Sequence, residues 1–315
     1  MRWLTRIFLG LFAIIAVVAG AVGIYVWRSL PPNNAQYTVA APLGETTVSI
    51  DENGIPTIEA KSERDLAFAV GFMHARDRLW QLEMNRRIGR GELAEILGPK
   101  ALETDKFLRT LGVHRAAKAQ FDGLTPEAKV LLQAYADGVN AYVRDAMGAR
   151  PPEFVILGVQ PGLWEPIDTV AWGIIMAYDL GGNWGNELLR LQMAARMPVS
   201  RIDELMPAQP GDKLPAHGDY AALYKSLDVL PTTEPKTASV DASTQLMFLS
   251  AGIEGIGSNN WVVNGGNTTS GKPLLANDPH LSLAAPAIWY FTRQKAPGIE
   301  VTGATLPGGD RKSVV

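Results

Sequence analysis

Apolar residues form one uninterrupted segment near the start of the chain. Arg2 and Arg6 precede an uncharged run from Ile7 to Trp27, which as a helix spans roughly 30 Å, the thickness of a bilayer core. We predict that residues 1–30 form an uncleaved transmembrane anchor with its basic end in the cytoplasm. A removed signal peptide and a buried helix of a soluble domain are the alternatives. With an anchor or a signal peptide, the remainder is exported and is membrane-anchored or periplasmic.

A two-residue alternation of apolar and polar positions comes next. It extends from Thr46 to Ile50 and resumes from Ile55 to Ala60. The dipeptide Asn53-Gly54 between these segments is typical of a tight turn, so the pattern predicts a β-hairpin.

Helical spacing follows the predicted hairpin. Ser62 or Asp65 can cap a long helix, whose apolar stripe consists of Leu66, Val70, Met73, Trp80 and Met84. Asp77 lies on this stripe, where a buried carboxylate needs a partner, and we predict Arg86 or Arg87 for that role. His74 lies on or near the buried side, where we expect it to pack and to form hydrogen bonds rather than to catalyse.

The remaining periodic segments predict a mainly helical middle and short strands near the end. The expected helices cover Leu102–Ala119, Pro126–Met147, Thr169–Leu180 and Asn186–Arg196, with a short apolar segment and a loop over Glu153–Gly162. The expected strands are Asn260–Val263, Leu274–Ala276, Ala287–Thr292 and Ile299–Thr302.

Residues from about Gln209 to Ser243 are rich in Pro, Thr, Ala, Asp and Ser, which is the composition of a linker and equally of a surface loop. The predicted organisation is therefore an anchor or signal segment over residues 1–30, a mainly helical region over 31–208, a spacer over 209–257 and a further region over 258–315.

Composition narrows the class of protein. The chain has 315 residues, of which 47% are hydrophobic and 19% charged, so it is long enough to bury one large or two ordinary cores. The formal net charge of −3 and the lack of a long basic tract argue against a nucleic-acid partner. There is no cysteine, and no two of the four histidines stand at metal-ligand spacing, which argues against a thiol nucleophile and a zinc hydrolase.

Gly257-Ser258 is the dipeptide with the most suggestive chemistry. Glycine lets the backbone adopt conformations in which the Ser258 hydroxyl reaches the preceding carbonyl carbon. A cut there would leave Ser258 with a free α-amine, whose ordinary pKa of about 7.7–8.0 suits a base near neutral pH. Taken alone, Gly-Ser-Asn-Asn is explained better by an ordinary turn, because these residues are common in turns for conformational reasons.

Flanking motifs favour the catalytic interpretation. They are Asp51–Pro56, the helix motif Asp65–Gln81, Arg86-Arg87, Gly91–Gly98, Gly257–Trp261 and Asn277–His280. From about residue 44 to about residue 307, the chain resembles the penicillin acylase family of N-terminal-nucleophile hydrolases.

The resemblance implies an α+β fold, an αββα sandwich that is incomplete here, with a largely helical smaller-chain region. It implies a precursor cut between Gly257 and Ser258 into a smaller and a larger chain that stay associated. The expected reaction is hydrolysis of a small-molecule acyl amide, at a carbon–nitrogen bond of a linear amide other than a peptide bond. Ser258 is the implied nucleophile and its new α-amine the base.

His280 matches a position where family members carry glutamine or histidine beside the nucleophile. A histidine at this position is shared by members that resemble acyl-homoserine-lactone and cephalosporin acylases. The His280 backbone amide is a candidate oxyanion donor. A histidine held in a polar loop is the alternative. Glu187 matches an acid that supplies one ligand of a structural calcium ion, with a solvated helix residue or a local ion pair as the alternative. Met176, Tyr178 and Trp184 line either an acyl pocket or the core.

Two features depart from the family. Only residues 258–315 follow the proposed cut, whereas the family's larger chain is several times longer, and the sequence after Gly308 no longer follows the family pattern. We therefore expect a truncated precursor that lacks further oxyanion donors and calcium ligands. The alternative is an inactive membrane-tethered fragment. Thr57, where relatives often carry histidine, affects local packing.

Overall fold

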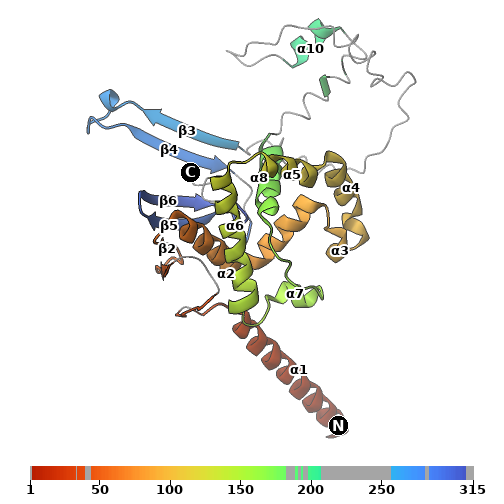
Figure 1. Cartoon of the computed structure of the whole chain (residues 1–315). Coiled ribbons are helices and arrows are strands. Elements are labelled where there is room, and N and C mark those ends of the chain that lie inside the picture. Colours follow the sequence, from red (N-terminus) through yellow and green to blue (C-terminus); the bar gives the residue numbers. More distant parts are fainter. Residues whose placement is uncertain are drawn as a thin grey trace. The chain divides into compact units, whose positions relative to one another are not determined.

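The structure is a computed structural model that describes residues 2–32, 34–39, 44–181, 189–190, 193, 198–206, 257–280 and 284–309. These residues form a mixture of helices and sheets (Figure 1). The chain divides into two compact units, the first comprising Met1–Ile175 with Leu283–Val315 and the second Met176–Ser282. The αββα sandwich and the domain boundaries expected from the sequence stay predictions.

The first unit contains most of the helices. They are α1 (Arg2–Ser29), α2 (Glu63–Arg90), α3 (Ala94–Leu97), the 3-10 turn η1 (Pro99–Ala101), α4 (Leu102–Leu111), α5 (Val113–Asp122), α6 (Pro126–Ala141), the π-helical turn η2 (Tyr142–Ala146), α7 (Pro152–Ile156) and α8 (Pro166–Leu180), which runs into the second unit.

Two sheets hold the strands. A four-stranded sheet of the first unit contains β1 (Thr47–Ile50), β2 (Pro56–Glu59), β5 (Tyr290–Ala296) and β6 (Ile299–Thr305). The second unit contains α10 (Val199–Leu205) and a two-stranded sheet of β3 (Gly257–Val263) and β4 (Leu274–His280), joined through the 3-10 turn η4 (Gly265–Asn267).

Helix α1 is apolar and exposed along its length. The segment Trp3–Ser29 is long and apolar enough to cross a membrane, as an anchor or as part of a signal sequence. Its last turns contact the rest of the first unit, since the Tyr25 hydroxyl donates a 2.6 Å hydrogen bond to the Arg150 carbonyl oxygen.

Helix α2 is the centre of the core. The Ser62 Oγ accepts a 3.1 Å hydrogen bond from the Asp65 amide and caps the helix start, as predicted, and Gly91 closes the other end at a φ of 65°. The helix packs closely along α6. A Cβ on Gly71 would lie 2.1 Å from the Tyr135 carbonyl oxygen, and one on Gly138 would lie 1.9 Å from that of Phe68. The two backbones are therefore in direct contact, which only glycine allows.

The four-stranded sheet combines strands of residues 47–59 with strands of residues 290–305. Its order is β1-β2-β5-β6, with antiparallel pairs at both edges and a parallel central pair, β2 with β5. Ile58 of β2 stands opposite Gln294 of β5 and is fully buried in the same core as Leu66. A parallel pair needs a long crossover, and α2 begins the segment that connects β2 to β5.

Local sequence patterns predicted most elements, with shifts where glycine intervenes. The hairpin of β1 and β2 is confirmed, and Gly54 adopts a φ of 78° in its turn. The single helix expected over Leu102–Ala119 is wrong, because Gly112 takes a φ of 78° and separates α4 from α5. Strand β5 begins at Tyr290 rather than at Ala287. Most of the helix predicted over Asn186–Arg196 and nearly all of the 209–257 spacer lie outside the described residues.

Candidate active site

The β3–β4 hairpin brings Ser258 and His280 to neighbouring positions of one ladder. Ser258 pairs with Pro279 and Gly257 with His280 in an antiparallel register. Directly opposite residues in such a ladder have Cα atoms about 4.5–5.5 Å apart. Pro279 has no N–H to donate to the ladder. The two residues predicted to act together are thus adjacent at the level of the backbone, at the open end of the hairpin.

The turn of the hairpin sets this register. The Asn264 side chain accepts a 2.9 Å hydrogen bond from the Gly266 amide, and the Thr268 hydroxyl lies 2.7 Å from the Lys272 carbonyl oxygen. Gly265 and Gly271 approach closely, since a Cβ on Gly265 would lie 2.4 Å from the Gly271 carbonyl oxygen. Because a slip of one residue would move His280 away from Gly257, this turn positions the candidate site.

The calcium ligand predicted at Glu187 lies outside the described residues. Within the described part of the chain, no group of three or more His, Asp or Glu side chains is arranged to hold a metal ion. The calcium site stays a prediction. Trp184, a candidate for the acyl pocket, also lies outside them, while Met176 is buried and Tyr178 half-buried on α8.

His74 is fully buried in a chain of hydrogen bonds. The Thr305 hydroxyl lies 2.9 Å from the Tyr290 carbonyl oxygen and donates to it, so Thr305 Oγ1 accepts from His74 Nε2 at 2.9 Å. His74 Nδ1 then accepts from the Tyr135 hydroxyl at 2.8 Å, and that oxygen accepts from the Gly308 amide at 2.9 Å. The hydrogen bonds of this chain have one consistent set of directions, in which the imidazole is neutral and protonated on Nε2.

Burial lowers the pKa of His74 from 6.5 to about 3, with a smaller contribution from the nearby charge of Arg78. The imidazole is therefore neutral at physiological pH. Both of its nitrogens are occupied by protein groups, so His74 has the packing and hydrogen-bonding role that the sequence predicted.

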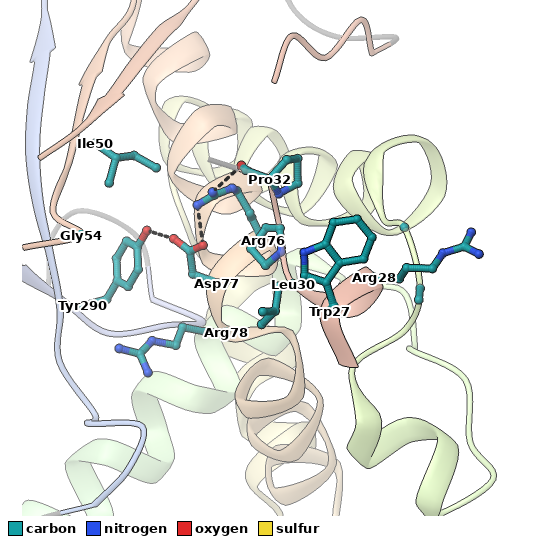
Figure 2. A pocket seen from close by; sticks show the side chains of 13 residues that line it. Trp27, Arg28, Leu30, Pro32, Ile50, Gly54, Arg76, Asp77, Arg78 and Tyr290 are labelled. Carbon is teal, nitrogen blue, oxygen red and sulfur yellow. Dashed lines mark hydrogen bonds and ion pairs between the residues drawn. The ribbon is translucent and has the colours of Figure 1, made fainter. Parts of the chain in front are cut away.

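Asp77 is bound by different partners from those predicted. One of its oxygens lies 2.6 Å from Arg76 Nη1, and the other accepts a 2.5 Å hydrogen bond from the Tyr290 hydroxyl (Figure 2). The prediction of Arg86 or Arg87 is wrong, because both of these side chains bind Glu83 instead. Burial, together with the adjacent Asp77 carboxylate, raises the pKa of Tyr290, so its hydroxyl stays protonated and donates.

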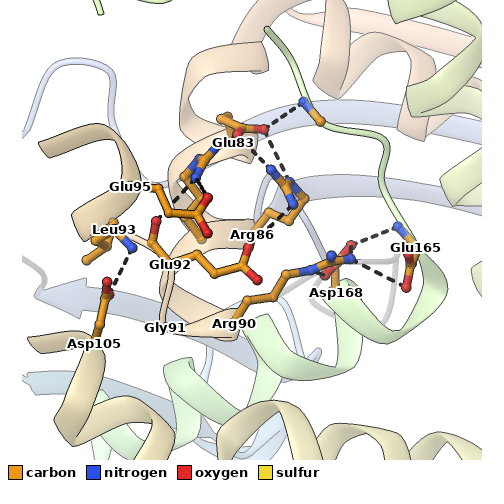
Figure 3. A network of polar contacts seen from close by, with 12 residues as sticks. Glu83, Arg86, Arg90, Gly91, Glu92, Leu93, Glu95, Asp105, Glu165 and Asp168 are labelled. Carbon is orange, nitrogen blue, oxygen red and sulfur yellow. Dashed lines mark hydrogen bonds and ion pairs between the residues drawn. The ribbon is translucent and has the colours of Figure 1, made fainter. Parts of the chain in front are cut away.

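Glu83 organises a buried cluster at the end of α2, which Figure 3 shows. Its Oε1 accepts from Arg86 Nη2 and Arg87 Nε, each at 2.7 Å, and its Oε2 accepts from Arg86 Nε at 3.2 Å and the Gly162 amide at 3.0 Å. Burial would raise the pKa of Glu83, but the hydrogen bonds and charge of Arg86, with Gly162 and Arg87, outweigh it and lower the pKa. The cluster ties the helix to the loop before α8.

A second ion pair anchors α8 directly. Arg90 donates through Nε and Nη2 to the two oxygens of Asp168, at 2.7 and 2.9 Å, and Asp168 also accepts a 2.8 Å bond from the Glu165 amide (Figure 3). A two-pronged arginine–carboxylate pair of this kind is strongly directional. These groups satisfy one another within the protein, so they are structural.

Comparison with known proteins assigns the sequence to a family. The sequence profile described as penicillin amidase matches residues 45–309, which is most of the chain and includes both Ser258 and His280. The chain belongs to the penicillin amidase family.

Curated members of the family are similar across nearly all of these residues. The acyl-homoserine lactone acylase QuiP of Pseudomonas aeruginosa is 30% identical over 98% of this chain. The penicillin acylase 2 proenzyme of Pseudomonas sp. strain SE83 is 35% identical over 89% of it, and the penicillin G acylase of Escherichia coli is 28% identical over 89%. The matches cover 36%, 36% and 38% of these relatives, so the chain spans little more than a third of their length.

Among solved structures, a thermostable penicillin G acylase from Alcaligenes faecalis aligns with 62% of this chain and 97% of its own, at 24% identity and a TM-score of 0.44.

Sequence reasoning singled out Ser258, His280 and His74, of which the structure tests only His74, and it missed Tyr290 and Asp168. Both act through partners far along the chain, and the family motifs that led to the first three include neither residue. Periodicity within one element does not distinguish Tyr290 or Asp168 from exposed hydroxyl-bearing or acidic residues of the same element. Only the parallel pairing of β2 with β5 and the position of α8 reveal their partners.

Proposed function

We propose that this chain carries the nucleophile and the smaller-chain region of an acylase that hydrolyses linear amides. Family membership over residues 45–309 supports the proposal, as do relatives named penicillin acylase and acyl-homoserine lactone acylase. The observation that carries it is the hairpin register, in which Gly257-Ser258 and Pro279-His280 pair with one another.

Maturation begins with the bond before Ser258. The hydroxyl oxygen attacks the Gly257 carbonyl carbon, the carbon–nitrogen bond breaks, and the nitrogen leaves as the α-amine of Ser258 with the hydroxyl proton. Water then hydrolyses the resulting ester, which releases Gly257 with a free carboxylate and restores the hydroxyl. The product is a serine at a chain start with its own base.

Turnover uses the same two groups. The α-amine takes the hydroxyl proton directly or through one water, and Ser258 Oγ attacks the acyl carbon of a linear amide substrate. The leaving amine takes the proton as its bond to carbon breaks, and water hydrolyses the acyl ester to regenerate Ser258. The backbone amide of His280 is proposed as an oxyanion donor, where loss of a donor typically costs about 3–4 kcal/mol of transition-state stabilisation.

Location and metal content belong to the same proposal. Helix α1 serves as an anchor or signal that exports the enzyme, and the smaller and larger chains stay together after the cut. Glu187 is proposed as one ligand of a structural calcium ion. No step of the reaction above uses that ion.

An inert tethered fragment is the second candidate. It is favoured by the exposed apolar residues of the β3–β4 hairpin, since Val262 is 74% and Leu275 75% exposed. Apolar residues on a strand that nothing covers form a surface for association. The acylase and the inert fragment differ in whether these 315 residues support any chemistry at Ser258.

The test is an assay with a panel of acyl p-nitroanilides that differ in acyl length. One sample contains these 315 residues, and a second contains residues 1–309 joined to the remainder of the Pseudomonas penicillin acylase 2 proenzyme. We expect nitroaniline release from the joined protein and its loss in Ser258→Ala. Equal release by Ser258→Ala would overturn the proposed nucleophile. No release from either sample would favour the inert fragment.

A further inference from the structure

A cavity of about 840 Å³ lies beside the end of helix α1, against α2, the β1–β2 hairpin and β5 (Figure 2). Trp27 and Arg28 line it from α1, Arg76, Asp77 and Arg78 from α2, and Tyr290 from β5. All of these residues belong to the first unit. The candidate nucleophile belongs to the second, so this cavity concerns a different part of the molecule.

Two of the charged groups in the cavity neutralise each other. Arg76 donates to Asp77 through Nη1 at 2.6 Å and to the Pro32 carbonyl oxygen through Nη2 at 3.0 Å. The second oxygen of Asp77 is occupied by the Tyr290 hydroxyl. These contacts tie the segment after α1 to the body of the unit, and each oxygen of Asp77 has a partner other than Arg78.

Arg78, in contrast, is not paired with any acid that the structure describes. Among the residues that the structure describes, it has no hydrogen bond or ion pair, and its guanidinium carbon lies 5.9 Å from the centre of the Tyr290 ring. Its backbone has a φ of −139° and a ψ of 28°, which interrupts the helical geometry of α2 at this position. With Arg28, whose side chain is exposed, the cavity presents two cations that no described acid neutralises.

The cavity also has an apolar rim suited to a membrane surface. Trp27 is 73% exposed, and Leu30 and Ile50 of the lining are exposed as well. Tryptophan concentrates where a membrane meets water, and this one ends the apolar span Trp3–Ser29. If α1 crosses a bilayer, the cavity lies where the chain leaves it, at the depth of the lipid headgroups.

We propose that this cavity binds the phosphate of an anionic phospholipid headgroup. The inference rests on helix α1 being retained as an anchor, which is part of the proposed function. Arg78 supplies the planar fork of donors that matches phosphate oxygens, Arg28 adds charge at the rim, and Trp27 contacts the upper part of the lipid. The site orients the body of the protein on the membrane in addition to the tether that α1 provides.

The test measures lipid bound to the whole chain in an uncharged detergent by native mass spectrometry. Short-chain phosphatidylglycerol is titrated against phosphatidylcholine, with inorganic phosphate and glycerol phosphate as soluble competitors. We expect preferential binding of phosphatidylglycerol, and about tenfold weaker binding in Arg78→Gln. Lys118→Gln removes a positive charge from the exposed surface of α5 and is the matched control.

Ile50→Glu is a second variant, because it adds an acid at a partly exposed strand position that lines the cavity. It too should weaken binding. Equal affinity for the two lipids, or unchanged binding in both variants, would overturn the proposal. Displacement by inorganic phosphate at similar concentrations would also overturn it, because a free anion would then be the ligand. Lipid binding is measured equally in Ser258→Ala, so its failure is distinct from failure of the acylase proposal.

Discussion

The Nε2 atom of His74 donates to the hydroxyl oxygen of Thr305 across 2.9 Å, although 231 positions separate the two residues. The proposed cut between Gly257 and Ser258 lies between them in the chain. Tyr290 with Asp77 and Asn85 with the Pro307 carbonyl oxygen span the same cut. The parallel pairing of β2 with β5 does so as well. The core is thus built from both sides of the proposed cleavage position.

We predict that the two pieces stay together after cleavage. A protease recognition site placed between residues 209 and 256 generates nearly the same two pieces without any reaction of Ser258. The test therefore does not depend on self-cleavage. Size-exclusion chromatography in native buffer should give one peak that contains both pieces, and denaturant should separate them. Separate peaks in native buffer would show that the contacts across the cut do not hold the fold.

Acid should destabilise the protein through His74. Its pKa is about 3 in the folded protein against 6.5 ordinarily, so the unfolded chain binds a proton between these values that the folded chain does not. The free energy of unfolding is therefore at its full value above pH 6.5 and falls as the pH decreases, by up to about 1.4 kcal/mol per pH unit from this group.

His74→Gln should remove this part of the slope. Urea unfolding of both proteins between pH 7.5 and 4.5 measures it, with the comparison at pH 7.5 giving the loss of the hydrogen bonds alone. Parallel slopes in the two proteins would contradict the buried neutral imidazole.

Removal of the Tyr290 hydroxyl should destabilise the first unit. Tyr290→Phe leaves an oxygen of Asp77 without its donor, which typically costs about 1–3 kcal/mol. Tyr37→Phe is the matched control, because the buried Tyr37 hydroxyl has no hydrogen-bond partner among the described residues. Its removal should be neutral or stabilising. Denaturant midpoints compare the two, and equal losses would contradict the role assigned to Tyr290.

The glycines between α2 and α6 should not tolerate a methyl group. In Gly71→Ala the new carbon would meet the Tyr135 carbonyl oxygen at 2.1 Å, so the helices must move apart at a cost of about 1–3 kcal/mol or more. Gly173 of α8 has open space around it. Gly173→Ala should therefore be stabilising by up to about 1 kcal/mol, through helix propensity alone. Thermal unfolding of the two variants should shift in opposite directions.

These contacts show what the sequence could and could not predict. Local rules identified the Asn53-Gly54 hairpin and the Ser62 cap because each depends on neighbours a few residues away. The predicted partner of Asp77 was wrong because Arg86 and Arg87 bind Glu83, while Asp77 binds its neighbour Arg76 and Tyr290. Tyr290 is distant in sequence and is placed by the β2–β5 pairing. Gly112 broke a helix that apolar spacing alone predicted as continuous.

The candidate site was predictable to a similar extent. Family motifs named Ser258 and His280, and the apolar patterns of Asn260–Val263 and Leu274–Ala276 predicted parts of both strands of the hairpin. The register that pairs Gly257 with His280 depends on the close approach of Gly265 to Gly271, which spacing does not specify.

The intact mass of the purified chain shows whether the bond before Ser258 is cut. We expect two masses, one for a piece that ends at Gly257 and one for a piece that begins at Ser258. Ser258→Cys, which keeps a nucleophile, should also be cut, whereas Ser258→Ala should remain one chain. A single uncut mass for the natural sequence, or cleavage at the same bond in Ser258→Ala, would contradict self-activation by this serine.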